Sequence, residues 1–420
     1  MPARDTVDIV GPADGTESYE LRDFLTRIDQ PYSWLEPESE QGRALLSAHR
    51  REGAAGTVVV VDGATVLESP SLEALADAIG IRYPPSRREY DLIVIGAGPA
   101  GLAAAVSAAS DGLRTVVAER GAPGGQAAYT SRIENYFGLD PDADPMTGAR
   151  LARIGGRQAE AFGAELLILR GVVGGGGGET PWVALSGGEE LHAEAVICAT
   201  GIEWRRLFVP GLDELVGNGV FYGAGRSEAP RFRGRRVAIV GAGNAAGQAA
   251  LNFAAYAERV TMLCRSATLG SSLSRYLAER IEREPRIDVL MQTRVEELHA
   301  DGGLDGVTVL DAAGGTSRLP IDGRFVAIGG APQTQWAEAS SLRRDEAGYL
   351  VTGPDLLELG RMPEGWPLER LPLALESSIP GFFVAGDVRH GSTKRVSAAV
   401  GEGAMAVSLV HRYLEERRAA

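Results

Sequence analysis

Cysteine is scarce in this sequence of 420 residues, which contains only Cys198 and Cys264. The two lie far apart, and each stands at the end of a predicted buried strand. We expect both to pack as small apolar side chains and to form neither a disulfide nor a redox pair. Lysine is scarcer still, because Lys394 is the only one in the chain.

Long apolar runs and an excess of basic charge are also missing. No run reaches the ~18 residues of a membrane helix, and the first residues, MPARDTVDIVGP, lack the apolar stretch of a signal peptide. A net charge of −14 argues against a nucleic-acid partner, because phosphate binding needs a basic surface. We therefore expect a cytoplasmic protein without a membrane or nucleic-acid partner, and we assign no metal site.

The chain is long enough for two or three domains, with 44% apolar and 23% charged residues, as in an ordinary globular protein. Residues 1–85 predict a small α/β domain. We expect strands at Val7–Val10, Tyr32–Leu35, Thr57–Val61 and Thr65–Glu68, and helices at Tyr19–Ile28, Gln41–His49 and Leu72–Ile79, with Ser71 as the cap of the last helix. A proline-containing charged linker follows at residues 82–89.

A glycine-rich motif occupies Asp91–Leu102, DLIVIGAGPAGL, between an apolar strand and a predicted helix. In this G-x-G-x-x-G pattern Gly96 allows a tight turn and Gly98 lets the backbone approach a pyrophosphate. Gly101 lets the helix pack close to the strand. The next strand ends at Glu119, close to the position ~20 residues on where an acid binds a ribose. The motif therefore predicts an adenine-dinucleotide site.

A second strand, turn and helix of the same kind begins with the strand Val237–Val240 and the turn Gly241–Ala246, GAGNAA. The following strand ends in Cys264-Arg265-Ser266, where no acid is available for a ribose hydroxyl. Arg265 instead can pair with a 2′-phosphate, which favours NADPH over NADH.

Two dinucleotide sites in one chain imply electron transfer between two nucleotides, and flavin is the usual acceptor of a nicotinamide hydride. If the second site is inserted into the first domain, the chain has to return to that domain. We expect this return at the strands Phe325–Gly329 and Phe382–Ala385, the turn Gly386-Asp387 and a helix at Ser397–Leu414. The FAD-binding domain would then comprise residues 89–210 and 325–420, and the NAD(P)H-binding domain residues 211–324.

Three further glycine-containing stretches lie inside the expected FAD-binding domain. Gly124-Gly125-Gln126 and Ala199-Thr200-Gly201 suit close approach of the backbone to an extended cofactor. The run Gly174–Gly178 predicts a slack surface hairpin without a role.

The motifs GAGPAG, PGGQ, IENY, ATG, GAGNAA, AIGGAPQT and GDV occur in the order seen in thioredoxin reductases, and residues 89–420 resemble that family. The resemblance implies an α/β fold with two Rossmann-like domains, FAD and NADPH as cofactors, and a homodimer. It implies FAD contacts at Gly96, Gly98, Pro99, Ala100, Gly101, Glu119, Gly125, Gln126, Asn135, Ala199, Thr200, Gly201, Gly386, Asp387, Lys394, Arg395 and Val396. It implies NADPH contacts at Gly241, Gly243, Asn244, Ala245, Ala246, Arg265 and Ser266. Lys394 and Arg395 fall beside the flavin ring and are the candidate catalytic residues.

The sequence departs from this family where the redox pair C-x-x-C is expected. Alignment from Tyr222 puts Gly223 and Arg226 at the cysteine positions, and alignment from Val237 puts Ala224 and Ser227 there. The H-R-R triplet of the family is reduced to Cys264-Arg265-Ser266, and Asp355–Leu373 is an additional segment. These features resemble a sub-branch of reductase-like flavoproteins without C-x-x-C.

The order of elements in residues 1–85 resembles a thioredoxin or glutaredoxin domain. The loop Gly11–Ser18, where that family carries C-x-x-C, has no cysteine, and Thr57 stands where it has a cis-proline. Thiol–disulfide exchange needs a thiolate, so we interpret this domain as a docking or structural module.

Three functions remain open on this sequence. The first is an NADPH-dependent flavoenzyme that passes electrons from FAD directly to an unidentified acceptor. The second is a non-catalytic, flavin-bound redox sensor or binding module. The third is a thioredoxin reductase that uses the cysteines of a partner.

Overall fold

The computed structural model describes the chain except residues 1–5, 13–14, 82, 131, 141–143, 145, 178–179, 206, 208, 210–211, 213–214, 216–218, 223–227, 270–272, 301–303, 339 and 420. The chain forms two compact units. Unit 1 comprises Met1–Ile79, Tyr129–Arg132 and Trp204–Gly330, and unit 2 comprises Gly80–Ala128, Ile133–Glu203 and Ala331–Ala420. No described helix combines the length and the apolar character that a membrane span requires.

Unit 2 is built on a seven-stranded sheet with the order β7-β6-β5-β10-β9-β8, in which β21 also pairs with β10. The strands are β5 (Glu89–Ile95), β6 (Thr115–Ala118), β7 (Glu165–Leu167), β8 (Val172–Gly176), β9 (Trp182–Leu185), β10 (Glu190–Cys198) and β21 (Phe382–Val384). The β5, β6, β7, β10 and β21 pairings are parallel, whereas β9 runs antiparallel to β10 and β8. Parallel strands are covered on both faces, which explains the continuous apolar run in β5.

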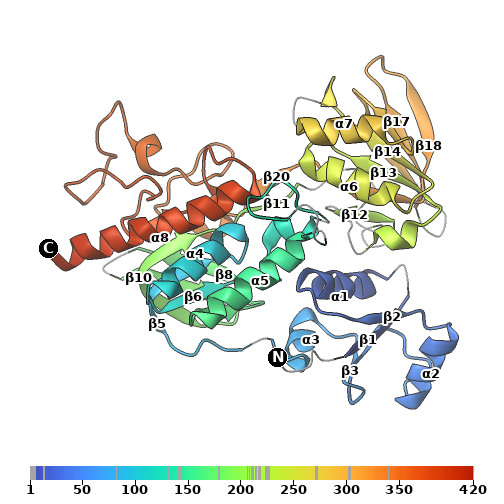
Figure 1. Ribbon diagram of the computed structural model, residues 1–420, viewed down its shortest axis with the longest axis horizontal. Helices are drawn as coiled ribbons and strands as arrows, with labels where there is room; N and C mark the ends of the chain where they lie inside the picture. The colour runs from blue at the N-terminus through green and yellow to red at the C-terminus, as the bar shows by residue number, and fades with distance from the viewer. Residues whose placement is uncertain are drawn as a thin grey trace. The chain divides into compact units, whose positions relative to one another are not determined.

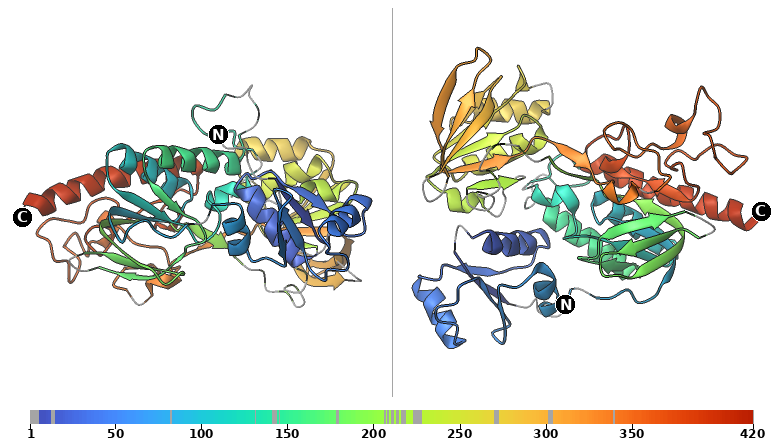
Figure 2. Two further views of the ribbon diagram at one scale, coloured as in Figure 1. Left: turned by 90° about the horizontal axis from the view of Figure 1, so that it is seen from below. Right: turned by 180° about the vertical axis from the view of Figure 1, so that it is seen from behind.

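Three helices cover one face of this sheet (Figures 1 and 2). They are α4 (Pro99–Ser110), α5 (Gly148–Ala161) and α8 (Val396–Ala419). Leu92 and Val94 of β5 point into their shared core, while Ile93 and Ile95 point into the core on the opposite face. The alanine-rich sequence of α4 allows close packing, and Gly403 of α8 lies directly against α4. A Cβ atom at Gly403 would come within 2.1 Å of the Ala100 carbonyl oxygen.

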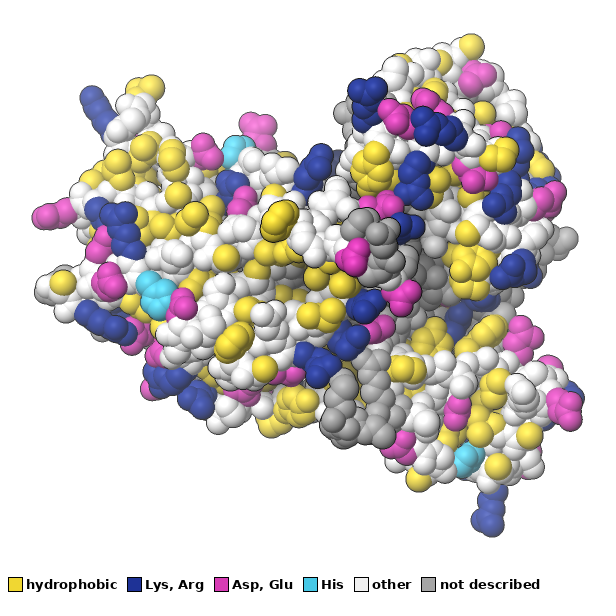
Figure 3. Space-filling model, in the orientation of Figure 1, with side chains coloured by type: hydrophobic (Ala, Val, Ile, Leu, Met, Phe, Trp, Pro, Cys, Tyr) yellow, Lys and Arg dark blue, Asp and Glu magenta, His cyan; other side chains and the backbone are white. Residues whose placement is uncertain are grey.

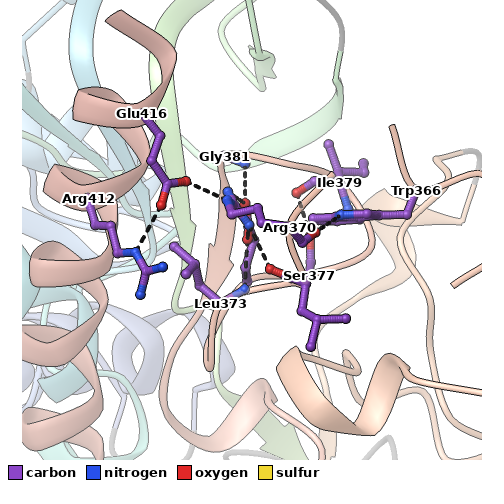
Figure 4. Close-up of polar contacts among 10 residues, drawn as sticks. Trp366, Arg370, Leu373, Ser377, Ile379, Gly381, Arg412 and Glu416 are labelled. Atoms are coloured by element: carbon purple, nitrogen blue, oxygen red, sulfur yellow. Dashed lines mark hydrogen bonds and ion pairs between the residues drawn. The ribbon is translucent and has the colours of Figure 1, made fainter. Parts of the chain in front are cut away.

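The additional segment Asp355–Leu373 is attached to α8 by a network of charged side chains (Figure 4). Glu376 is fully buried, and its carboxylate accepts hydrogen bonds from Arg370 and from the backbone N–H groups of Leu373 and Gly381. Arg370 also forms an ion pair with Glu416 of α8. Satisfaction of both oxygens of Glu376 explains how a carboxylate is tolerated at this depth. The network therefore fixes the segment to the end of the chain.

Unit 1 contains a second Rossmann-like sheet with the order β12-β19-β13-β14-β15, all in parallel. Its strands are β12 (Val220–Tyr222), β13 (Arg236–Val240), β14 (Arg259–Leu263), β15 (Ile287–Leu290) and β19 (Gly323–Val326). Helices α6 (Asn244–Ala254) and α7 (Arg275–Arg283) pack on one face. An antiparallel sheet of β16 (Arg294–Ala300), β17 (Leu304–Leu310) and β18 (Thr316–Pro320) contributes Leu304, Val307 and Val309 to the core on the other face.

Residues before Ile79 form a four-stranded sheet of their own, with the order β2-β1-β3-β4. The elements are β1 (Val7–Val10), α1 (Thr16–Arg27), β2 (Ser33–Leu35), α2 (Glu40–Ala48), β3 (Val58–Val61), β4 (Thr65–Glu68) and α3 (Leu72–Ala78), in the order that the sequence predicts. Strand β2 runs parallel to β1, whereas β3 is antiparallel to both β1 and β4. Ser71 caps α3 as expected, because its Oγ accepts from the Ala74 N–H at 3.2 Å.

Two expectations on the fold are wrong. The strand predicted at Phe325–Gly329 as the return to the FAD-binding domain is β19, which lies between β12 and β13 in the second sheet. The run Gly174–Gly178 does belong to a hairpin, but it is not slack where it is described, because Gly174, Gly175 and Gly176 are part of β8 (Val172–Gly176) and pair with β9, whereas Gly178 lies outside the described residues. In the first case long-range pairing, which a local pattern does not reveal, decides the position of the strand. In the second case the pairing is between neighbouring segments, with Gly175 opposite Val183 and Gly176 opposite Trp182.

The surface mixes charges of both signs. On the face drawn in Figure 3, basic and acidic side chains are interspersed over both units. Many exposed arginines are paired, as in the ion pair of Arg114 with Asp91 at 2.6 Å. Such exposed pairs contribute little stability.

The contact between α4 and α8 yields a prediction with an internal control. Gly403→Ala should lower the free energy of unfolding by about 1–3 kcal/mol, since the methyl group would overlap the Ala100 carbonyl. Gly401→Ala in the same helix should raise it by about 0.5–1 kcal/mol, because Gly401 has open space around it. Denaturant titrations of both variants measure the difference, and equal effects would contradict the predicted packing.

Candidate dinucleotide-binding sites

The first glycine turn connects β5 to α4 and requires glycine for steric reasons. Gly96 has a φ of +101°, and a Cβ atom there would lie 2.6 Å from the Ala199 carbonyl oxygen. A Cβ atom at Gly101 would lie 1.8 Å from the Gly96 carbonyl oxygen. At Gly98, in contrast, a Cβ atom would meet nothing within 4 Å. The protein backbone therefore leaves no room for a side chain at Gly96 and Gly101, whereas the space beside Gly98 is open to a ligand.

The open side of this turn lies at the N-terminus of α4. Gly98 is the N-cap residue and Pro99 the first residue of the helix, and no side chain caps it. Backbone N–H groups of the first turn, which includes Ala100 and Gly101, therefore keep their capacity to bind a ligand. Such a helix N-terminus is suited to bind a phosphate group.

Glu119 lies directly after β6 and against the glycine turn. Its Oε2 accepts from the Ala97 N–H at 2.7 Å, and its Oε1 accepts from the Gly121 N–H at 2.8 Å. Each carboxylate oxygen can accept a further hydrogen bond. The side chain is thus fixed beside the turn with capacity left for a hydroxyl group, and its role as a ribose-binding acid stays a prediction.

A second turn packs against the first. Gly124 donates its N–H to the Ala97 carbonyl at 2.7 Å, and a Cβ atom at Gly125 would lie 3.4 Å from the Gly98 Cα. Gln126 follows in η1 (Gly125–Tyr129), and its Oε1 is buried without a hydrogen-bond partner among the described residues. A buried amide oxygen without a donor is costly, which a bound cofactor would relieve.

Two other predicted FAD contacts differ in their position. Ala199-Thr200-Gly201 follows β10 next to the first turn: Ala199 donates its N–H to the Ile95 carbonyl, and Thr200 donates its hydroxyl to the Gln333 carbonyl at 2.9 Å. Asn135 is exposed, in the segment between η1 and α5.

The C-terminal part of the chain meets the first turn at Gly386. This residue begins η7 (Gly386–Val388), and a Cβ atom there would lie 2.9 Å from the Ala100 Cβ. Its N–H donates to Glu402 of α8 at 2.8 Å. Burial raises the pKa of the neighbouring Asp387 to about 6, and the charge of Lys394 opposes that shift.

Lys394 lies beside Asp387, but its ammonium group is occupied. Its Nζ donates to the Asp387 carbonyl and to the Ser392 Oγ, each at 2.6 Å, and lies 4.3 Å from the centre of the Tyr349 ring. Burial lowers the pKa of this lysine. These contacts tie the Gly386-Asp387 turn to the start of α8, where Arg395 is exposed and Val396 is the first helical residue.

The second glycine turn connects β13 to α6 and repeats the geometry of the first. Gly241 has a φ of +139°, and a Cβ atom there would lie 2.2 Å from the Ala327 carbonyl oxygen. At Gly243 a Cβ atom would meet nothing within 4 Å, and no side chain caps α6. Asn244, Ala245 and Ala246 form the first turn of this helix, and the Oδ1 of Asn244 accepts from the backbone N–H and the hydroxyl of Ser274.

Arg265 and Ser266 follow β14, the neighbour of β13, as Glu119 follows β6. Arg265 is exposed and forms no ion pair with a described residue. The Ser266 Oγ is buried and has no hydrogen-bond partner in the described part of the chain. A guanidinium and a hydroxyl donor side by side fit a phosphate group.

The two cysteines lie in different cores. Cys198 ends β10 in unit 2, and Cys264 follows β14 in unit 1. Burial raises the pKa of both thiols to about 11, so neither is a thiolate near neutral pH. Residues Gly223–Ser227, which include all positions that the sequence aligns with the redox pair, lie outside the described residues.

Comparisons with known proteins show which family the chain resembles. Residues 90–403 match the pyridine nucleotide-disulphide oxidoreductase family. The chain is 33% identical to the thioredoxin reductase of Listeria innocua over 335 residues, which cover 79% of this chain and 96% of the relative. It is 33% identical to that of Bacillus subtilis over 331 residues, or 78% and 95% of the two chains. The structure of the T. acidophilum thioredoxin reductase superposes with a TM-score of 0.68 at 27% identity, covering 79% of this chain and 99% of the other.

The two open glycines yield reciprocal predictions. Gly98→Ala should lower FAD content, because its methyl group would protrude where a pyrophosphate approaches, and Gly243→Ala should weaken NADPH binding in the same way. We expect a loss of affinity of about 10-fold or more in each case, equivalent to about 1.4 kcal/mol. Flavin absorbance measures the FAD content of Gly98→Ala, and calorimetric titration with NADPH measures the affinity of Gly243→Ala.

Each variant is the control for the other, since neither added methyl group meets a protein atom within 4 Å. Their thermal stabilities without cofactor should therefore match the wild type. If Gly98→Ala weakened only NADPH binding, the assignment of the two sites would be reversed.

Proposed function

Because the chain belongs to the thioredoxin reductase family of pyridine nucleotide-disulphide oxidoreductases, we propose that it passes electrons from FAD directly to an acceptor without an internal disulfide. The family uses FAD and NADPH, and the chain is an NADPH-dependent flavoprotein oxidoreductase. The observation that carries the proposal is the state of the thiols: the only two are buried, lie in separate cores and have raised pKa values.

The proposal assigns the two cofactors to the two turns. Gly96, Gly98, Gly101 and the first turn of α4 would hold the FAD pyrophosphate, and Glu119 its ribose. Gly125, Gln126, Gly386 and Asp387 would complete this site. Gly241, Gly243 and the first turn of α6 would hold the NADPH pyrophosphate, with Arg265 and Ser266 at the 2′-phosphate. When bound, the flavin accepts a hydride from the nicotinamide and supplies electrons to the acceptor.

Lys394 has a positioning role in this proposal and no direct part in the chemistry. Its Nζ is engaged by the Asp387 carbonyl and the Ser392 hydroxyl, so the side chain holds the turn that carries Asp387. The ammonium charge also favours the ionised form of the Asp387 carboxyl, which is otherwise buried.

We infer that residues before Ile79 form a thioredoxin-like domain. The support is its sheet order β2-β1-β3-β4, with β2 parallel to β1 and the two other pairs antiparallel. Helix α1 follows the loop Gly11–Gly15, in which the described residues carry no thiol. The domain therefore contributes contacts and no electron transfer of its own.

The decisive experiment is reduction of the flavin by NADPH without oxygen. The purified protein should be yellow, and NADPH should bleach the flavin absorbance. A turnover screen with oxygen, quinones, ferricyanide, small disulfides and oxidised thioredoxin then identifies the acceptor. A flavin that neither NADPH nor NADH reduces would favour the alternative of a flavin-bound sensor. Turnover with thioredoxin alone would favour a reductase that uses the thiols of its partner.

The choice between NADPH and NADH yields a separate prediction. Arg265→Ala should raise the KM for NADPH by about 10- to 100-fold, since a hydrogen bond to a charged group contributes about 1.5–3 kcal/mol. The KM for NADH should change little. Arg275→Ala is the matched control, because Arg275 is an exposed arginine of the same unit that pairs with Glu279. Equal effects of Arg265→Ala on both nucleotides would contradict a role at the 2′-phosphate.

A further inference from the structure

Helix α1 of the N-terminal domain presents two different faces. Leu21, Phe24 and Leu25 make up one face, and all three are buried. The positions Tyr19, Arg22, Asp23 and Arg27 recur at the spacing of a second helical face. Every one of these four side chains contacts residues outside the N-terminal domain but inside the same compact unit.

Two of these four side chains, Tyr19 and Arg22, contact the second Rossmann-like fold. Tyr19 packs edge-on against Phe221 of β12, with ring centres 5.3 Å apart. Arg22 forms an ion pair with Glu228 at 3.2 Å, and Glu228 is the residue before η3 (Ala229–Phe232). Strand β12 ends at Tyr222 and η3 begins at Ala229. Helix α1 therefore holds the chain on both sides of residues 223–227, the segment that carries neither cysteine of the family motif.

The ion pair is the most buried part of this contact. The side chains of Arg22 and Glu228 are 2% and 0% exposed. Arg231 also pairs with Glu228, and the guanidinium groups of Arg22 and Arg231 lie 4.8 and 5.3 Å from the centre of the Trp34 ring. Removal of one member of a buried pair leaves an uncompensated charge, which costs far more than the loss of an exposed pair.

A second cluster lies one turn further along the helix. Tyr129 donates its hydroxyl to Asp23 at 3.4 Å, and the Arg27 guanidinium lies 4.9 Å from the centre of the Tyr129 ring. Burial raises the pKa of Asp23 to about 6, with Arg27 opposing that shift. The contact thus combines an aromatic pair and two charged clusters, which specifies one orientation of α1.

We propose that the N-terminal domain is a resident protein partner of the NADPH-binding fold, docked through α1, and that it closes the face formed by β12 and η3 to other proteins. The docking itself does not depend on flavin chemistry. The consequence for electron transfer, that no protein acceptor binds at this face, rests on the proposed function.

A charge-swap cycle in the full-length protein tests the docking. Arg22→Glu should increase amide hydrogen exchange in peptides that cover β12 and η3 by about 10-fold or more, because two carboxylates would meet at a buried position. Glu228→Arg should act similarly. The double variant R22E/E228R should restore protection in part, to a level between R22E and the wild type, since opposite charges face one another again at these two positions while the introduced arginine now meets Arg231.

Two controls separate docking from folding. Arg43→Glu makes the same charge change on α2, where Arg43 is exposed, and should leave exchange at β12 and η3 unchanged. Peptides from β1 and β3, the buried strands of the N-terminal sheet, should stay protected in all variants. Unchanged exchange at β12 and η3 in R22E would overturn the docking, and so would exchange in the double variant that is as fast as in R22E.

A separate exchange measurement tests whether the face formed by β12 and η3 is closed to other proteins. Oxidised bacterial thioredoxin, added in excess to the wild-type protein, should change neither the exchange of α1 nor that of η3. Loss of protection in α1 would mean that thioredoxin displaces the domain and would overturn the proposed closure. Neither measurement uses turnover, so failure of NADPH to reduce the flavin is distinguishable from failure of this inference.

Discussion

The close approach of backbone to backbone at two glycine turns is the constraint on which both sites depend. At Gly96 the space for a side chain is taken by the Ala199 carbonyl, and at Gly241 by the Ala327 carbonyl. Ala199 directly follows β10, the neighbour of β5, and Ala327 directly follows β19, the neighbour of β13. Each turn can therefore form only when that neighbouring strand is in place. Tertiary pairing and cofactor geometry are therefore linked in each fold.

The two Rossmann-like folds share this turn geometry. They differ in the side chains that follow the strand after the helix, which is β6 in one fold and β14 in the other. Glu119, beside the first turn, is held by the Ala97 and Gly121 N–H groups and presents an acceptor. Arg265 and Ser266, which follow β14 in the other fold, present donors. An acceptor suits a ribose hydroxyl and a donor pair suits a phosphate, which is the basis on which we propose FAD for the first turn and NADPH for the second.

Local sequence predicts these turns well, because glycine spacing, an apolar strand and a helix start lie within about 12 residues of one another. It fails where distant segments decide the structure. The strand at Gly323–Val326 fits either sheet by its apolar pattern, and only its pairing with β12 and β13 places it. Arg324 in this strand is fully buried without a hydrogen-bond acceptor among the described residues. The sequence alone does not reveal this, because an arginine is expected at the surface. The partners Arg22 and Glu228 are 206 residues apart.

The charged contact of α1 is informative because ion pairs are poor sources of stability when buried. Apolar side chains of similar volume usually stabilise such a contact as well or better. Paired charges instead destabilise any orientation of α1 in which a buried charge loses its partner. A domain that carries no thiol in its described loop is thus held by an interaction whose main effect is specificity. Its contacts flank the segment that lacks the redox pair. If, as proposed, no disulfide of the NADPH-binding fold has to meet a partner, a domain docked at that face would obstruct no step of electron transfer.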